Sequence, residues 1–319
     1  MIYLSYAIVA SIVVFLSIKA AKYVDLIDKT TSLSGAFIGG ILLSTVTSLP
    51  ELLTSISATV LLDNPGLSLG NILGSNLFNL TILAALILFG INSFKKSKIS
   101  KSHFMTTIFL CLIYIVIVLN MLNILNFEIL TISFTSILIL ILYGFGLREM
   151  ANDNSEYKEK EADEVAASID LTLKQIIIRF IFTSIGLVVF SVLITYITDI
   201  ISARLNLGTG FAGALFLGIA TSLPEVTSCI SLTKIGNFNI AVGNILGSNI
   251  FNFLVLFIAD VIYMKGNLYL FNDPKTVNLL ICGTIGTPLM LFLLKGKKNF
   301  TYIISSIGII TCYLLFLIL

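Results

Sequence analysis

Charged residues are scarce in this sequence. Asp, Glu, Lys and Arg make up only 11% of its 319 residues, whereas 57% of the residues are hydrophobic. Because a soluble globular domain usually has about a quarter charged residues, this composition excludes an ordinary soluble domain. Apolar runs of about eighteen or more residues recur along the chain, which indicates a protein that crosses a membrane several times. The first run is too long for a cleaved signal peptide and lacks a basic start.

Histidine and paired cysteines are scarce as well. The single histidine, His103, lies beside lysines at the edge of an apolar run, and this position supports neither a histidine metal site nor a Ser–His triad. The four cysteines lie singly in apolar segments, and none forms a Cys-x-x-Cys pair. We interpret them as small hydrophobic side chains of membrane helices.

The alternating apolar and polar pattern of a membrane β-barrel is missing too. The apolar runs are long and uniform, so we predict an all-α membrane protein with ten transmembrane helices in two inverted five-helix repeats. The ten predicted spans are roughly Tyr3–Ala21, Leu33–Leu62, Leu67–Ile91, Phe104–Met121, Phe127–Leu147, Ile176–Ile200, Gly208–Leu232, Phe238–Met264, Thr276–Leu294 and Phe300–Leu319.

Lysine and arginine are distributed unevenly over the predicted connections. Of the nineteen, only Arg204, Lys265 and Lys275 fall on the side of both termini. Because cytoplasmic loops carry the excess of basic residues, we predict a multi-pass plasma-membrane protein with both termini outside. The acidic loop 148–174 is then cytoplasmic. We interpret it as a solvated linker; a regulatory cation-binding role lacks ligand spacing of the EF-hand kind.

Two short sequences occur once on each side of this loop. TSLPE occurs at Thr47–Glu51 and Thr221–Glu225, and GNILGSN occurs at Gly70–Asn76 and Gly243–Asn249. Because each predicted half has an odd number of spans, the two copies lie inverted in the membrane, as in many secondary transporters. The predicted parts are a first half at 1–147 with its repeat at 33–92, the loop at 148–174, and a second half at 175–319 with its repeat at 208–264.

The glutamates of the TSLPE sequences, Glu51 and Glu225, are the acids that fall well inside predicted spans. A charge at the bilayer centre costs at least ~2.5–3.5 kcal/mol, so such an acid is a candidate functional residue. Pro50 and Pro224 precede the two acids, and each proline removes a helical N–H and favours a kink. The carbonyls that lose their donor are tolerated at this depth where they line a cavity or bind an ion.

Neutral oxygen atoms accompany both acids. On the GNILGSN helices, an Asn-Ser-Asn trio recurs at i, i+4 and i+8, which makes a polar stripe on one face. The trios are Asn71, Ser75 and Asn79, and Asn244, Ser248 and Asn252. The alternatives are that the hydroxyls bond back to their own helix and that the asparagines hold helices together. The Gly-x-x-x-Gly pairs of the same helices indicate close packing rather than ligation.

These residues predict a cation site made only of oxygen ligands. Such a site suits hard cations, namely calcium, sodium and, less well, magnesium. Two carboxylates neutralise one divalent ion but can instead hold sodium ions or protons, and this competition is what an antiporter requires. The candidate oxygens are those of the two glutamates, the hydroxyls of Thr47, Ser48, Thr221 and Ser222, and the polar groups of the two trios.

With these motifs the chain resembles the cation/calcium exchanger superfamily, most closely the prokaryotic sodium/calcium exchangers. The resemblance implies four ion subsites between the repeats, with Glu51 and Glu225 binding calcium centrally. It implies that the subsites are completed by Thr47, Ser48, Ser75, Asn79, Thr221, Ser222, Ser248 and Asn252. It implies exchange of external sodium for internal calcium by alternating access, with the first and sixth spans moving. Sodium and calcium ions are then substrates, and no prosthetic group or nucleic acid is expected.

The chain departs from the resemblance at a few positions. Val46 and Ala220 stand where the superfamily often has glycine, which affects local helix flexibility rather than the ligands. Asn252 stands where some members, including potassium-dependent ones, have an acid, and it argues against potassium transport. Both GNILG sequences lack the glutamate that proton/calcium exchangers have there.

Other functions remain as alternatives to a monomeric sodium/calcium exchanger. The main one is a proton-coupled antiporter of calcium or another divalent cation, because neighbouring carboxylates also exchange protons. An intramembrane protease lacks a Gly-x-Gly-Asp motif and a Ser–His dyad. A channel fits less well, because inverted repeats around a buried acidic site favour occlusion over a continuous pore.

Overall fold

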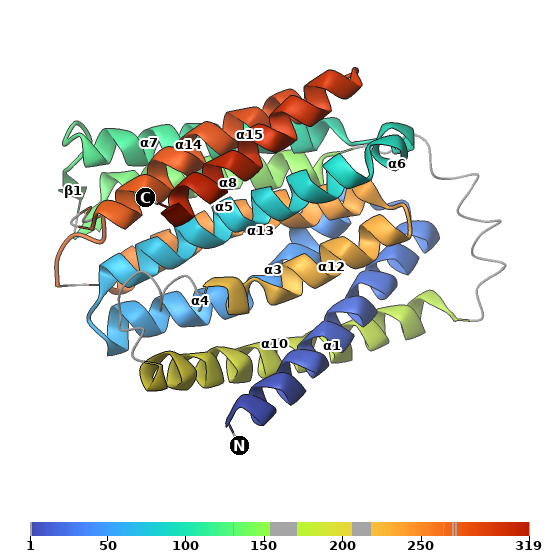
Figure 1. Ribbon diagram of the computed structural model, residues 1–319, viewed down its shortest axis with the longest axis horizontal. Coiled ribbons are helices and arrows are strands. Elements are labelled where there is room, and N and C mark those ends of the chain that lie inside the picture. The colour runs from blue at the N-terminus through green and yellow to red at the C-terminus, as the bar shows by residue number, and fades with distance from the viewer. Residues whose placement is uncertain are drawn as a thin grey trace.

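Long helices make up most of the molecule and run alongside one another (Figure 1). The computed structural model describes residues 2–129, 131–153, 171–205, 218–263, 265–269, 271 and 273–318. Within these residues, eight helices are long and apolar enough to cross a membrane. They are α1 (Ile2–Thr30), α5 (Pro65–Phe89), α7 (Lys101–Met121), α8 (Phe134–Ala151), α10 (Leu173–Arg204), α13 (Phe238–Ile262), α14 (Pro274–Lys295) and α15 (Asn299–Ile318).

The chain between α1 and α5 forms a ninth span that is broken in the middle. Its pieces are α2 (Gly35–Phe37), the π-helix η1 (Ile38–Leu43), α3 (Ser44–Thr47), α4 (Leu49–Ile56) and the π-helix η2 (Ser57–Leu61). The two parts meet at Ser48 and are bent by 41°. Pro50 follows the bend and cannot donate the hydrogen bond that would continue the helix. The predicted kink beside Glu51 is therefore confirmed.

The second repeat is broken at the equivalent residue. Residues 218–221 are helical, Ser222 leaves the helical backbone conformation with φ −80° and ψ 5°, and α12 (Leu223–Lys234) follows. Pro224 is again the second residue after the break. Residues 208–217 of the predicted seventh span lie outside the described residues, as does most of the predicted loop 148–174.

The central helices α5 and α13 run antiparallel. Asp63, just before α5, pairs with Lys265, just after α13, at 3.0 Å. Gly90, at the other end of α5, lies against Phe238, the first residue of α13. The two helices carry the same GNILGSN sequence in opposite directions, so the fold consists of two inverted repeats, as the sequence predicted.

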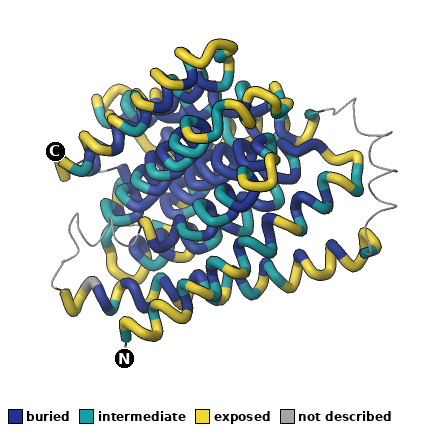
Figure 2. Tube along the Cα trace, turned by 45° about the vertical axis from the view of Figure 1, so that its right-hand side comes forward, coloured by how far each residue is buried: buried dark blue, intermediate teal, exposed yellow. Residues whose placement is uncertain are grey.

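Each repeat is covered by helices of the other half. The helices α7 and α8 pack on α13, whereas α14 and α15 pack on α5. The helices α1 and α10 pack on each other along one side of the molecule, at the lower edge of Figure 1. Buried residues concentrate on the central helices, and the outer helices carry most of the exposed ones (Figure 2). The multi-pass, all-helical class is confirmed.

Two predicted span boundaries are wrong. Helix α1 continues past Ala21 to Thr30, because a helix does not have to end where its apolar run ends, and Lys29 and Asp25 pair at 2.7 Å on its last turns. The predicted fifth span begins too early at Phe127. Two short antiparallel strands, β1 (Glu128–Ile129) and β2 (Ile132–Ser133), precede α8 instead. Elsewhere in the chain, the short helix α6 (Ile91–Lys96) follows α5.

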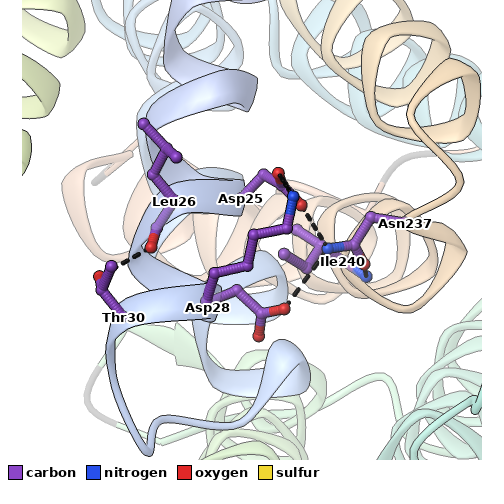
Figure 3. Close-up of polar contacts among 7 residues, drawn as sticks. Asp25, Leu26, Asp28, Thr30, Asn237 and Ile240 are labelled. Carbon is purple, nitrogen blue, oxygen red and sulfur yellow. Dashed lines mark hydrogen bonds and ion pairs between the residues drawn. The ribbon is translucent and has the colours of Figure 1, made fainter. Parts of the chain in front are cut away.

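The end of α1 is attached to the start of α13, as Figure 3 shows. Asn237 donates from Nδ2 to Asp25 Oδ1 at 2.8 Å and to Asp28 Oδ2 at 3.4 Å. Its Oδ1 accepts a hydrogen bond from the backbone N–H of Ile240 and so caps α13. One asparagine therefore joins the outer helix pair to a central helix.

Candidate functional site

The predicted site residues gather where the broken helices meet α5 and α13. Glu51 and Glu225 each occupy the first turn after a break, and neither side chain is exposed. All ten predicted ligands are buried, namely Thr47, Ser48, Glu51, Ser75, Asn79, Thr221, Ser222, Glu225, Ser248 and Asn252. Two acids far apart in the sequence therefore share one polar centre among apolar helices.

The two repeats exchange hydrogen bonds through these acids. Ser48 of the first repeat donates from Oγ to Glu225 Oε1 at 2.8 Å. Ser222 of the second repeat donates from Oγ to Glu51 Oε1 at 3.1 Å. Each serine sits at its own helix break, so the breaks place both hydroxyls beside the opposite carboxylate. This reciprocal arrangement is what two inverted copies of TSLPE produce when they face each other.

The threonines bond within their own turns. Thr47 donates from Oγ1 toward the Ser44 carbonyl at 3.2 Å, and Thr221 donates toward the Gly218 carbonyl at 3.1 Å. Both threonines therefore have the back-bonding acceptor. The Thr47 hydroxyl also has an acceptor on α13, because its Oγ1 lies 3.4 Å from Asn244 Oδ1, and it lies 3.4 Å from Ser248 Oγ.

The asparagines form a second reciprocal group. Asn79 donates to Asn249 Oδ1 at 3.1 Å, and Asn252 donates to Asn76 Oδ1 at 2.9 Å. The sequence reasoning missed Asn76 and Asn249 as members of the site. A signal was present, because both are the last residue of the repeated GNILGSN sequence.

Several buried oxygens of this centre have no hydrogen-bond partner within the described part of the chain. They belong to both carboxylates, to amide groups and to one hydroxyl. Buried polar atoms are almost always paired, so unpaired acceptors on residues that share this polar centre fit a cation. The atoms are Glu51 Oε2, Glu225 Oε2, Asn71 Oδ1, Asn79 Oδ1, Asn252 Oδ1 and Ser75 Oγ.

Glycines bring the broken helix of the first repeat close to α13. A Cβ at Gly247 would overlap the backbone of Gly40, and a Cβ at Gly39 would overlap the carbonyl of Ile240. The packing role predicted for the α13 glycines is therefore visible. In the first repeat, among described neighbours, a Cβ at Gly74 would meet only Leu279 Cδ1, at 3.9 Å.

No group of three or more His, Cys, Asp or Glu side chains that could hold a metal occurs in the described residues. The two carboxylates are accompanied instead by hydroxyl and amide oxygens, which suit hard cations rather than a resident transition metal. A multi-pass membrane protein with two inverted repeats, broken helices and a buried polar centre has the architecture of a secondary transporter.

Comparison with known families identifies the kind of transporter. The family model described as sodium/calcium exchanger protein matches residues 4–147 and 175–319. The chain therefore belongs to the sodium/calcium exchanger protein family. The family resemblance seen in the motifs is confirmed.

Individual relatives are distant in sequence. The chain is 26% identical over 219 residues to an uncharacterized membrane protein of Methanocaldococcus jannaschii, covering 69% of this chain and 68% of that protein. It is 24% identical over 255 residues to inner membrane protein YrbG of Escherichia coli, covering 77% of this chain and 74% of that protein. The mouse sodium/potassium/calcium exchanger 4 is 32% identical over 82 residues, which cover 26% of this chain and only 13% of that protein.

Solved structures of the sodium-calcium exchanger NCX_Mj have the same fold. One of them, soaked with sodium and strontium, matches with a TM-score of 0.75 and 20% sequence identity, covering 100% of this chain and 98% of that chain. Another, soaked with sodium and without calcium, matches with a TM-score of 0.73 at 21% identity, covering 99% and 98%. At this identity the match is evidence for the fold alone.

Proposed function

We propose that this protein is a secondary antiporter that exports calcium from the cell in exchange for external sodium. The observation that carries the proposal is the reciprocal pair of buried bonds, Ser48 to Glu225 and Ser222 to Glu51, beside unpaired carboxylate and amide oxygens. Two carboxylates balance one calcium ion. Sodium and calcium are substrates here, and the relatives named for sodium/calcium exchange support this choice of ions.

The binding step is a competition for one set of oxygens. Glu51 and Glu225 each have one oxygen, Oε1, that accepts from a serine of the opposite repeat, and one oxygen, Oε2, that has no hydrogen-bond partner among the described residues. Calcium takes both free carboxylate oxygens at once, whereas sodium ions take them separately together with neutral oxygens. The remaining proposed ligands complete the subsites, namely Thr47, Ser48, Ser75, Asn79, Thr221, Ser222, Ser248 and Asn252.

The transport step is alternating access around this fixed centre. The helices α1 and α10 pack mainly on each other and touch the broken helices α12 and α4, so as a pair they are placed to uncover the centre from one side or the other. The bond from Asn237 to Asp25 joins α1 to α13 and has to stretch or break if α1 slides. A ligand drives such a change only through different affinity for the two facing states.

The orientation and assembly complete the proposal. The excess of lysine and arginine on one side supports an orientation with both termini outside the cell and the loop 148–174 in the cytoplasm. One chain contains both repeats and both acids, so a monomer is sufficient for exchange. If three sodium ions replace one calcium ion, each cycle moves one net charge, and the membrane potential then changes the rate.

The test uses purified protein in liposomes. The liposomes are loaded with sodium or with choline and diluted into radioactive calcium. Calcium uptake that requires an outward sodium gradient, and that increases when valinomycin and potassium make the interior positive, is the expected result. Uptake driven by a pH gradient without sodium would replace this proposal with the proton-coupled antiporter, and uptake that needs no gradient of either ion would contradict both.

A further inference from the structure

We propose that Asn76 and Asn249 are positioning residues that fix the side-chain amides of Asn252 and Asn79, so that both amides offer a neutral oxygen to the transported ion. The inference rests on the proposed function, because it concerns the same site. It assigns a role to two residues that are not themselves proposed ligands. An ionised aspartate at position 79 or 252 of this chain is then expected to be unfavourable.

The orientation of Asn76 and Asn249 follows from the backbone. Asn76 donates from Nδ2 to the backbone carbonyl of Asn249 at 3.2 Å, and Asn249 donates from Nδ2 to the backbone carbonyl of Asn76 at 3.0 Å. A carbonyl oxygen only accepts hydrogen bonds, so the nitrogen of each amide has to face it. This determines which end of each amide is oxygen, a choice that must be made from the hydrogen-bond network.

The amide orientations of Asn79 and Asn252 are then determined as well. Asn76 Oδ1 accepts only, and Asn252 donates to it from Nδ2 at 2.9 Å. Asn249 Oδ1 likewise accepts from Asn79 Nδ2 at 3.1 Å. The Oδ1 atoms of Asn79 and Asn252 therefore point away from these bonds, and neither has a partner within the described residues.

Burial keeps these four amide orientations fixed. The exposed fraction is 0% for Asn76, Asn79 and Asn252 and 2% for Asn249, so in this conformation bulk water does not replace a lost partner. A rotated amide at Asn252 would set its oxygen against Asn76 Oδ1 and its N–H groups toward the cation. Both consequences are unfavourable at a site that binds cations.

The same hydrogen bonds disfavour a further negative charge in the site. A carboxylate at position 79 or 252 has no proton to donate, so it would face Asn249 Oδ1 or Asn76 Oδ1 as one acceptor against another. The arrangement therefore accommodates neutral amides and leaves Glu51 and Glu225 as the two charges. A site with two negative charges matches one divalent cation or two monovalent cations without excess charge.

A merely structural role makes a different prediction. The same bonds join α5 to α13 at their midpoints, and if holding the helices were their whole purpose, losing one would lower stability without a specific effect on the ion. The two roles are separated by a double-mutant cycle, because a positioning residue loses its effect once the residue it positions is gone.

The experiment compares calcium-dependent uptake in liposomes for N76A, N252A, N79A and the doubles N76A/N252A and N76A/N79A. We expect N76A to raise the half-saturating calcium concentration about tenfold, the loss of one well-oriented ligand. The maximal rate should stay within about twofold of the unchanged protein. N76A/N252A should be no worse than N252A, whereas N76A and N79A should have multiplicative effects. The inference would be overturned if N76A combined additively with both N252A and N79A. It would also be overturned if N76A left the half-saturating calcium concentration unchanged.

The inverted pair provides a second test. N249A should couple to N79A and not to N252A. If N76A does not fold, judged by size-exclusion profile and circular dichroism, the N249A cycle decides. Failure of both N76A and N249A to fold would assign these residues to helix packing and reject the positioning role. Equilibrium binding of radioactive calcium to the detergent-solubilised variants gives the same comparison without sodium, so it remains valid if the unchanged protein shows no sodium-driven exchange and the proposed function fails.

Discussion

The two repeats carry the same motifs but surround their glutamates differently. Glu225 Oε1 accepts from Ser48 at 2.8 Å and also lies 3.5 Å from Ser248 Oγ, the hydroxyl on its own α13. Glu51 Oε1 accepts from Ser222, and the matching hydroxyl of Ser75 has no partner in the part of the chain that is described. Identical sequences in inverted orientation therefore give two related carboxylates that are not equivalent.

The residues just outside the identical motifs differ as well. Ser44, three residues before Thr47, donates its hydroxyl to the Gly40 carbonyl, whereas the equivalent residue before Thr221 is Gly218. A Cβ at Gly218 would lie 3.9 Å from Asn71 Oδ1, so the second repeat leaves space where the first has a side chain. The two copies therefore share the plan of the site but not the residues that flank it.

The largest expected effect tests what the repeats share. Glu51→Gln and Glu225→Gln should each abolish calcium transport, because either change leaves a single carboxylate to balance a divalent ion. Uptake of radioactive calcium by sodium-loaded liposomes measures this. Glu128→Gln, an exposed acid on β1, is the matched control and should transport normally. Full activity in either buried variant would show that the central site has been assigned to the wrong residues.

The next prediction tests the close approach of α13 to the broken helix of the first repeat. Gly247→Ala should destabilise the protein by about 1–3 kcal/mol or more, because the new methyl group overlaps the Gly40 backbone. Gly144→Ala, on the outer helix α8, is the control and should have a much smaller effect, because a Cβ there would meet no described atom within 4 Å. Thermal unfolding followed by circular dichroism suits a chain without tryptophan. Equal destabilisation would mean that the contact with Gly40 does not confine position 247.

A smaller effect should distinguish the two serines. Ser222→Ala removes the donor to Glu51 and should raise the half-saturating calcium concentration about tenfold. Ser48→Ala should raise it less, because Glu225 keeps Ser248 nearby. Both variants are compared in the same liposome assay, with Ser97→Ala, far from the site on the chain after α6, as the control. A larger effect for Ser48→Ala would contradict the proposal that Glu51 depends more on its serine donor than Glu225 does.

The smallest effect should come from making the repeats more alike. In the first repeat Asn71 donates from Nδ2 to Ser55 Oγ at 3.4 Å. The equivalent of Ser55 is Cys229, and Nδ2 of Asn244 has no partner among the described residues. Cys229→Ser should therefore stabilise the protein by about 0.5–1.5 kcal/mol.

The measurement is again thermal unfolding. Cys312→Ser is the control, because it places a hydroxyl on α15, away from the unpaired amide. If Cys229→Ser is no more stable than Cys312→Ser, the amide of Asn244 does not meet the side chain at position 229, and the two repeats differ there in more than one residue.

Most of the helical plan was predictable from the sequence, because a span has to be apolar over most of its length whatever it packs against. The break at Ser48 was predictable for a local reason, since Pro50 lacks an N–H wherever it stands. The end of α1 was not, because the helix continues beyond its apolar run. Its last turns carry polar residues whose contacts, Lys29 with Asp25 and Asp25 with Asn237, are seen only in the folded chain.

The residue types of the polar centre were predictable in part, and their connections were not. Buried acids after prolines, repeated beside hydroxyls and amides, indicate a cation site by residue type alone. Which serine bonds to which glutamate depends on two chain segments more than 170 residues apart. Asn76 and Asn249 are marked in the sequence only as the last residues of the repeated GNILGSN, and their hydrogen bonds to backbone carbonyls of the opposite helix are not marked at all.

The sequence by itself determined the membrane class, the inverted duplication and the residue types available for a cation, because each depends on composition, periodicity or local backbone chemistry. Only the tertiary structure decided how the two copies differ. Hydrogen bonds between distant segments require atoms to lie within about 3 Å of each other, and that distance is set by the packing of α5, α13 and the two broken helices against one another.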